Sequence, residues 1–357
     1  MKLRSITLAL ALSATAAIPT LALAATAPAA SAKSAWKAPR TPLGQPDLQG
    51  TWTNATITPL TRPSKFGERN VLTPDEARGQ EQATAEQVKR ADLPTDPNLK
   101  VGDLKNADCG ADGISGFNCG YNQGWKDPGT NVIDFNGEKR ASILTEPKNG
   151  QFPPMAKAAT DRRRGRTPGG AYDGPEQRGL GERCLLSFGS SAGPPMLPLM
   201  YNNTYAITQT KDAVVIEVEM VHDTRIIRLN TRHDPNNLKT WMGDSIGRWD
   251  GDTLVIETIN MRPEQGLRGG SPNQKVTEWL TRIGPNKIKY RFTVDDPSTY
   301  IEPFSGEVAF NATKGQLYEY ACHEGNYAME GILAGAREAE KAGKPITGGD
   351  AREEGSN

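Results

Sequence analysis

Val276–Val294, with the sequence VTEWLTRIGPNKIKYRFTV, is the stretch that decides the fold of this chain. In its second half, Ile, Tyr, Phe and Val at even positions alternate with Lys, Lys, Arg and Thr at odd positions. This alternation is typical of a β-strand with one buried face and one face in water. Gly284-Pro285-Asn286 separates this strand from Val276–Ile283, so the stretch predicts a β-hairpin.

The same pattern of short strands and turns recurs elsewhere in the chain. Further hairpins are predicted at 131–144 around Asn136-Gly137, at 245–258 around Asp250-Gly251, and at 306–321, and another strand is predicted at 213–222. Hairpin-linked strands that share one apolar face must close into a barrel or pack as a sandwich to protect their edges. We therefore expect a mainly β protein, an antiparallel meander closed as a barrel, with a β-sandwich as the alternative.

Two helices are expected beside the strands. The segment Leu72–Glu76 offers a Thr cap, Pro at the first helical position and Glu three residues after the cap, which together form a capping box. A polar surface helix should therefore run near 74–91. Asn326 can cap a second helix, near 327–341, which we expect to plug one end of the barrel or to cover one edge.

The first residues have the organisation of a secretory signal peptide. Lys2 and Arg4 precede an apolar run from Ile6 to Ala24, which ends in the cleavage-like sequence Ala22-Leu23-Ala24. We expect residues 1–24 to be removed and the mature protein to be periplasmic or secreted. No later segment is apolar enough to be a transmembrane span.

The remaining chain is expected to form one domain. Residues 25–47 indicate a flexible leader, 48–342 a single β-rich domain and 343–357 a disordered tail. The domain contains inserts rich in Gly and Pro at 92–130 and 151–198. Long inserts of this kind tend to be functional lids or disordered segments.

The charge balance excludes some classes of partner. Lys and Arg number 42, as do Asp and Glu, and removal of the signal peptide takes away two positive charges. This balance does not attract nucleic acid or an anionic membrane surface. We therefore expect a small-molecule ligand or substrate.

Four cysteines in an exported chain indicate disulfides, because the compartment outside the cytoplasm is oxidising. Three pairings are possible. Cys109 and Cys119 bracket a loop rich in Gly, Asn and Asp and can close it locally. That pairing, which we expect, leaves Cys184 and Cys322 to join two distant segments.

The histidines indicate a candidate site, because the chain has only three. His323 precedes Glu324 at the end of a predicted strand, and His222 precedes Asp223 at the end of another. If the strand from residue 213 keeps its alternation, His222 points into the barrel. The two pairs of histidine and acid can then converge on one site.

Such a site supports two chemistries. Its imidazoles and carboxylates can act as general acid and base. Alternatively, His222, His323 and Glu324 bind a divalent metal with open positions for water or substrate. No close metal-ligand spacing is present in the sequence. We therefore expect His222, His323, Asp223 and Glu324 to act without a cofactor.

Three further residues are expected to bind substrate. Arg225 and Arg228 lie close to His222 in the sequence, and an arginine in an apolar barrel needs a carboxylate partner from the protein or from the ligand. Asp244 precedes a strand and is expected to face the same opening as His222. His233, in contrast, is interpreted as a surface turn residue.

These patterns predict a lyase, isomerase or hydrolase that acts on a small organic molecule or a sugar derivative. The sequence has no nucleophile elbow, phosphate-binding glycine loop or dinucleotide fingerprint. The alternative is a non-catalytic carrier, in which the histidines only satisfy hydrogen bonds. A structural module of the cell envelope is a third interpretation.

Three motifs resemble those of an uncharacterised family of exported bacterial proteins. They are QGTWT at Gln49–Thr53, GRWDGDTLVIET at Gly247–Thr258 and YEYACHEGNYAM at Tyr318–Met329. The resemblance covers most of the mature chain and implies export and a β-rich domain. Gly50-Thr51-Trp52 also looks like the Gly-x-Trp that opens lipocalin barrels, which implies a lipocalin-like barrel, although the long Gly/Pro inserts depart from that pattern.

Overall fold

The computed structural model describes residues 36–92, 126–157, 159–160, 172–265, 267, 270–344 and 346. The signal peptide predicted at 1–24, the Cys109–Cys119 pairing, most of the insert predicted at 92–130 and most of the tail predicted at 343–357 lie outside these residues. Everything below concerns the unit formed by residues 36–357.

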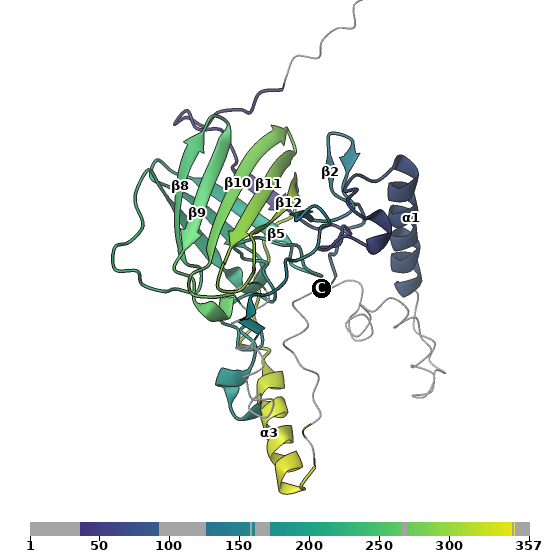
Figure 1. Cartoon of the computed structure of the whole chain (residues 1–357), viewed down its shortest axis with the longest axis vertical. Coiled ribbons are helices and arrows are strands. Elements are labelled where there is room, and N and C mark those ends of the chain that lie inside the picture. The colour runs from purple at the N-terminus through teal and green to yellow at the C-terminus, as the bar shows by residue number, and fades with distance from the viewer. Residues whose placement is uncertain are drawn as a thin grey trace, which may run out of the picture. The chain divides into compact units, whose positions relative to one another are not determined.

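A closed β-barrel is the centre of this unit (Figure 1). Its strands, in the order of the sheet, are β1 (Gly50–Thr53), β5 (Thr204–Gln209), β6 (Ala213–Val218), β7 (Thr224–Leu229), β8 (Asp244–Asp250), β9 (Thr253–Ile259), β10 (Lys275–Gly284), β11 (Lys287–Asp295) and β12 (Phe304–Ala312). Trp52 of β1 pairs with Ala312 of β12, and this pairing closes the sheet. Closure confirms the barrel and argues against the sandwich.

Three shorter strands and several short helices complete the described elements. Strand β4 (Leu144–Glu146) adds to β12, while β2 (Asp134–Phe135) and β3 (Glu138–Lys139) form the hairpin predicted at Asn136-Gly137. The 3₁₀ turns are Ser64–Phe66, Pro175–Gln177, Met220–His222 and Pro263–Gln265. No α-helix among the described residues is both long and apolar enough to cross a bilayer.

One pair of strands departs from the antiparallel meander. Strands β7 and β8 are parallel, with Arg228 opposite Ile246 and Leu229 opposite Gly247. A tight turn cannot join parallel neighbours, because the chain must first return to the end at which the previous strand began. Residues 230–243 make that return. The barrel is therefore mixed rather than wholly antiparallel.

The hairpin predicted at 306–321 is wrong in its second half. Strand β12 is present, but residues 317–321 form no strand and are mostly exposed. One edge of β12 pairs with β11, and the other edge pairs with β1 near Asn311 and with β4 near Ser305. Both edges are therefore occupied, and no place remains for a following strand.

The barrel interior is filled by side chains. Ile288, Tyr290, Phe292 and Val294 point inward from β11, as the alternation predicts, and are at most 1 % exposed. Aromatic rings from several strands pack edge to face: the ring of Phe310 lies 4.9 Å from Tyr205 and 5.6 Å from Tyr290, measured between centroids. These contacts leave the interior as a packed core.

An irregular segment, Ser187–Leu197, also belongs to this core, and we call it the inserted loop. Ala192 and Met196 are fully buried within the main apolar cluster. The backbone N–H of Met196 donates to the hydroxyl of Tyr290 at 2.9 Å, and the side-chain amide of Gln265 donates to the carbonyl of Gly193 at 2.9 Å. This part of the insert predicted as a lid or disordered segment is therefore core structure.

The C-terminal helix α3 (Tyr327–Lys341) starts as predicted, because the side chain of Asn326 accepts from the backbone N–H of Met329 at 3.3 Å. Among its described side chains only Ala336 is buried. Arg337 donates to the carbonyls of Tyr172 and Asp173. The helix packs against that segment, and the inserted loop, rather than α3, enters the barrel core.

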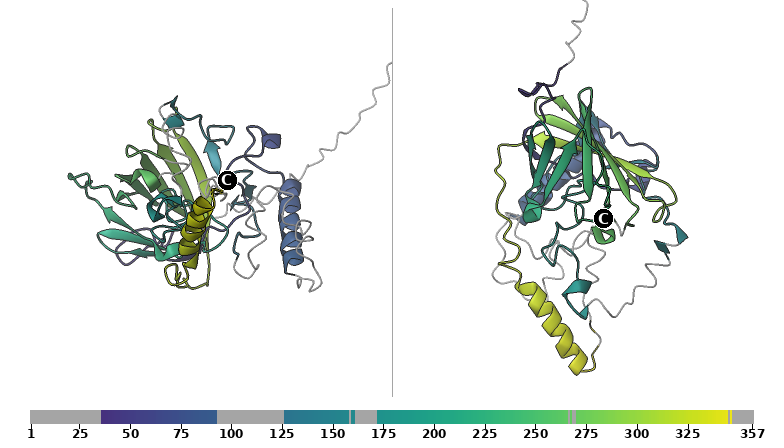
Figure 2. Two further views of the ribbon diagram at one scale, coloured as in Figure 1. Left: turned by 90° about the horizontal axis from the view of Figure 1, so that it is seen from below. Right: turned by 90° about the vertical axis from the view of Figure 1, so that its left-hand side faces the viewer.

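Helix α1 (Pro74–Ala91) has the predicted bounds and the predicted cap. Thr73 Oγ1 accepts from the N–H of Glu76 at 3.2 Å, and Glu76 Oε2 accepts from the N–H of Thr73 at 2.7 Å. A small second core forms beside this helix from Phe66, Leu72, Ala77, Val132 and Ala141. Figure 2 shows α1 and the barrel strands from two further sides.

Residues 36–47, expected to belong to a flexible leader, are instead attached to the barrel. Arg40 forms a β-bridge with Pro46 and an ion pair with Asp252. The side-chain amide of Gln209 donates to the side chain of Gln45 and to the carbonyl of Pro46, each at 3.0 Å. Hydrogen bonds to β5 therefore order the chain well before β1.

Candidate functional site

A tight corner, Glu219–Asp223, connects β6 to β7. Strand β6 ends at Val218, so the alternation does not reach residue 222, and the prediction that His222 points into the barrel is wrong. His222 is exposed, while Val221 is buried. The backbone N–H of Val218 donates to the carbonyl of Asp223 at 2.8 Å, which closes the corner.

The backbone of this corner is strained. Val221 and His222 have φ angles of 57° and 46°, in the left-handed region that side chains other than glycine rarely adopt. Val221 is in addition β-branched, which makes that region still less favourable. Each such residue costs about 1–3 kcal/mol, and residues of this kind cluster at functional sites. The surrounding structure must therefore hold the corner in place.

Asp223 lies at the end of the corner and is half-buried. Its Oδ2 accepts from the backbone N–H of Ser187, in the inserted loop, at 2.9 Å. Burial raises the pKa of Asp223 from about 3.8 to about 6, although the hydrogen bond from Ser187 and the charge of His222 act in the opposite direction. A carboxyl group that titrates near pH 6 can both donate and accept protons at neutral pH.

A second carboxyl with a raised pKa lies near this corner. Burial is the main cause at Asp127, and the negative charge of Glu219 adds to the shift. The side chain of Asn203 donates to the carbonyl of Asp127 at 2.7 Å. Sequence reasoning missed Asp127, because the flanking residues have no periodicity that would assign them to a helix or a strand.

The other predicted pair, His323 and Glu324, is exposed and lies in the turn before α3 rather than at the end of a strand. The disulfide predicted between Cys184 and Cys322 is present and spans 138 residues. It tethers His323 to the segment just before Ser187, which contacts Asp223. No described hydrogen bond or ion pair joins His222 to His323.

Asp244 and Arg228 do meet, but on the outer wall of the barrel. Arg228 Nη2 lies 2.6 Å from Asp244 Oδ1. The ring of His233 lies between two carboxylates, with Nδ1 3.0 Å from Asp244 and Nε2 3.2 Å from Glu257. Lys275 pairs with the other oxygen of Glu257 at 2.6 Å. We call these five residues the wall cluster.

The wall cluster is an ion-pair network rather than an open site. Burial acts against ionisation of Asp244, yet hydrogen bonds from the N–H of Asp234, Arg228 and His233 lower its pKa. The hydrogen bond from Lys275 lowers the pKa of Glu257. The signal for this cluster was available in the sequence, because the Asp250-Gly251 turn places Asp244 opposite Ile259 and hence diagonal to Glu257.

Arg225 lies inside the barrel and is 1 % exposed. Its expected carboxylate partner comes from the protein: Nη1 and Nη2 donate to the two carboxylate oxygens of Glu278 at 2.9 and 2.5 Å. Tyr290 also donates to Glu278, at 2.8 Å. The guanidinium therefore serves the core, and the structure offers it no contact with a substrate.

A metal centre is not assembled in the described part of the chain. No three His, Cys, Asp or Glu side chains there form a group that could hold a metal ion. The alternative ligand set of His222, His323 and Glu324 therefore does not converge in this structure.

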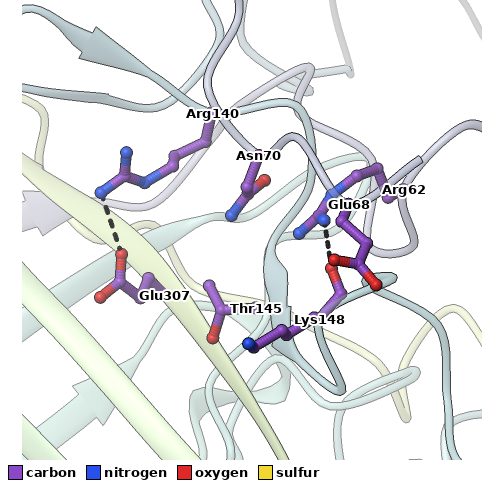
Figure 3. A pocket seen from close by; sticks show the side chains of 7 residues that line it. All are labelled: Arg62, Glu68, Asn70, Arg140, Thr145, Lys148 and Glu307. Atoms are coloured by element: carbon purple, nitrogen blue, oxygen red, sulfur yellow. Dashed lines mark hydrogen bonds and ion pairs between the residues drawn. The ribbon is translucent and has the colours of Figure 1, made fainter. Parts of the chain in front are cut away.

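A pocket of about 270 Å³ lies outside the barrel interior (Figure 3). Arg62, Arg140 and Lys148 contribute positive charge to its lining, and none of the predicted site residues contributes to it. A second hollow, of about 250 Å³, lies on the outer face of β9–β11 beside Trp279 and Arg291.

None of the known protein-family models matches this sequence, and a comparison with curated proteins found no significant match.

Proposed function

We propose that this protein is an exported enzyme that acts on a small organic molecule or a sugar derivative by acid/base chemistry, as a lyase, isomerase or hydrolase. The reacting groups are Asp223 and His222. The observation that carries this proposal is the half-buried Asp223 carboxyl, whose pKa is raised to about 6 next to an exposed imidazole. Titratable groups with perturbed pKa values are frequent at catalytic sites.

The two side chains have complementary roles. Asp223 is held by the N–H of Ser187 and exchanges its proton with substrate near neutral pH. His222 is exposed and accepts or donates the second proton. The strained backbone supports this assignment, because strain of this size is retained where it positions reacting groups.

His323 and Glu324 are proposed as a second part of the same site. The Cys184–Cys322 disulfide keeps them near the segment that contacts Asp223. Together with the charged N-terminus and the apolar run that follows it, the disulfide also supports export to the periplasm or to the medium.

A carrier that binds its ligand inside the barrel receives less support. Trp52, Tyr205 and Tyr290 fill the interior, and the inserted loop contributes Met196 to the same core. Lipocalin-like carriers instead need an open interior that can hold a ligand. The packed interior therefore favours chemistry at the barrel end over storage within it.

The test is a screen for turnover by the mature protein between pH 5 and 8. The substrates are p-nitrophenyl esters and glycosides for hydrolysis and uronic-acid oligosaccharides for elimination. We expect Asp223→Asn and His222→Ala each to lower turnover at least about 100-fold, the usual contribution of a general acid or base. Asp212→Asn, on the exposed turn before β6, is the matched control.

Equal turnover by wild type and by both corner variants would contradict the proposal. A wild-type protein that transforms none of these substrates would contradict the hydrolase and lyase forms of the proposal.

A further inference from the structure

We propose that the pocket in Figure 3 binds a small ligand through a carboxylate or phosphate group. We call it the Arg62 pocket. It does not include the Glu219–Asp223 corner, so this proposal does not depend on the proposed enzyme activity.

The side chain of Arg62 is buried, and its guanidinium is only partly hydrogen-bonded. Its guanidinium donates from Nε to Ser142 Oγ at 3.1 Å, from Nη1 to the carbonyl of Lys148 at 2.5 Å and from Nη2 to the carbonyl of Leu144 at 3.2 Å. A guanidinium has further N–H donors, one on each Nη atom here, and these have no partner among the described residues.

Arg62 also forms no direct ion pair with a described residue. Within the described residues no carboxylate oxygen lies within 4.0 Å of its guanidinium, although the residue is only 2 % exposed. Burial lowers the pKa of Arg62, while the negative charges of Glu146 and Glu68 act in the opposite direction without forming an ion pair with it. An anionic ligand that reaches the free N–H groups of Arg62 would form such an ion pair.

The lining of the pocket keeps a net positive charge after the internal ion pairs are assigned. Glu307 is neutralised by Lys289 at 2.6 Å and Arg140 at 3.4 Å. Lys148 and Glu68 are exposed at the pocket and form no ion pair with any described residue. Among the lining residues, the positive charges of Arg62 and Lys148 therefore outnumber the unpaired carboxylate of Glu68, and the lining has a net positive charge. Glu146 also acts on Arg62 but does not line the pocket.

Neutral polar groups also line the pocket. The Oδ1 of Asn70 accepts from both the N–H and the hydroxyl of Ser142 at 3.1 Å, which fixes the orientation of its side chain. The amide Nδ2 of Asn70 is thereby left as a donor, and Figure 3 shows this side chain between Arg140 and Arg62. Thr145 adds a hydroxyl to the lining. These groups suit an oxyanion that also carries hydroxyls.

The size of the pocket limits the ligand. A cavity of about 270 Å³ lies at the small end of the range for ligand sites. A sugar acid or a small phosphate compound fits it better than a large or apolar molecule. Inorganic phosphate represents ligands with a phosphate group, and glucuronate represents ligands with a carboxylate group.

The test is isothermal titration calorimetry of the mature protein with sodium phosphate and with sodium glucuronate, at constant ionic strength set with sodium chloride. Binding of either anion supports the proposal, and the anion that binds more tightly shows whether the pocket prefers a phosphate or a carboxylate group. Lys148→Gln should weaken binding about tenfold, since it removes one charged hydrogen bond. Glu68→Gln should tighten binding about threefold, because it removes a like charge from the ligand's surroundings.

Arg62→Lys is the obvious variant, but Arg62 also bonds three protein groups and its replacement can destabilise the fold. The exposed Lys148 and Glu68 variants keep the test independent of folding. Lys211→Gln, on an exposed turn, is the matched control for charge. The proposal is overturned if neither anion binds, if Lys148→Gln and Lys211→Gln weaken binding equally, or if Glu68→Gln fails to tighten it.

Discussion

Asp223 is placed where burial and hydrogen bonding oppose each other. Burial disfavours its charged form, whereas the N–H of Ser187 and the charge of His222 favour it, and the balance raises the pKa to about 6. A carboxyl with such a pKa binds a proton more tightly in the folded protein than in the unfolded chain. Its effect on stability therefore depends on pH.

Asp223→Asn should reveal this dependence. Between about pH 4 and pH 6 the folded wild type holds the Asp223 proton while the unfolded chain releases it, so this residue lowers the free energy of unfolding as pH rises. The difference in unfolding free energy, Asn variant minus wild type, should rise across this window and stay constant above about pH 7. Urea unfolding at several pH values measures it. A constant difference, like the one expected for the Asp212→Asn control, would contradict the raised pKa.

Sequence reasoning selected Asp223 and His222 but misplaced the histidine. The alternation in β6 was visible, but the place where it ends was not, since the turn at Glu219–His222 depends on backbone angles that Val221 adopts only under tertiary constraint. The environment of Arg62 could not be predicted either, because its partners Ser142 and Lys148 are about 80 residues away in the sequence.

At the scale of the element, local patterns were reliable and pairings between distant strands were not. The hairpin β10–β11 follows directly from alternation around a Gly-Pro-Asn turn. The parallel pair β7–β8 and the missing strand at 317–321 depend instead on which sheet edges are free. A single sequence contains no direct signal for which strand edges are free to pair.

The capping box of α1 gives a prediction at this scale. Thr73→Ala removes the acceptor for the N–H of Glu76 and should destabilise α1 by about 1 kcal/mol. Hydrogen exchange of the α1 amides measures the loss. Thr84→Ala, within the same helix, is the control and should leave protection unchanged or raise it slightly, because Ala is the better helix former. Equal losses of hydrogen-exchange protection in the two variants would show that the Thr73 cap makes no specific contribution to the stability of α1.

At the scale of the whole molecule, the barrel is organised around a buried ion pair and an inserted loop. Arg225 and Glu278 join β7 to β10 across the interior, and Tyr290 links the pair to the inserted loop through Met196. Closure of the barrel could be predicted from the number of hairpin-linked strands. The identity of the segment that fills it could not, since Gly- and Pro-rich sequence is equally typical of exposed loops.

Glu278→Gln should be strongly destabilising. The substitution leaves the Arg225 charge buried without a counter-ion, which costs about 3–5 kcal/mol. Urea unfolding followed by tryptophan fluorescence measures the change. Glu217→Gln, on the exposed face of β6, is the matched control and should change stability by less than about 0.5 kcal/mol. A similar small effect at Glu278 would contradict the role of the pair.

The Cys184–Cys322 disulfide should also contribute to global stability, because it closes a loop of 138 residues. A Cys184→Ala/Cys322→Ala double variant should lose about 2–5 kcal/mol of unfolding free energy. The double variant is preferable to a reducing agent, because it changes this crosslink alone. Unchanged stability would show that the crosslink only positions residues 313–326.

The most direct test of the central claim is a ¹³C NMR titration of the Asp223 carboxyl in aspartate-labelled protein, assigned by comparison with Asp223→Asn. We predict a midpoint at about pH 6, which rises further in His222→Ala because the imidazolium charge lowers it in the wild type. A midpoint near pH 4, unaffected by His222→Ala, would show an ordinary surface aspartate and would contradict an acid/base site at this corner.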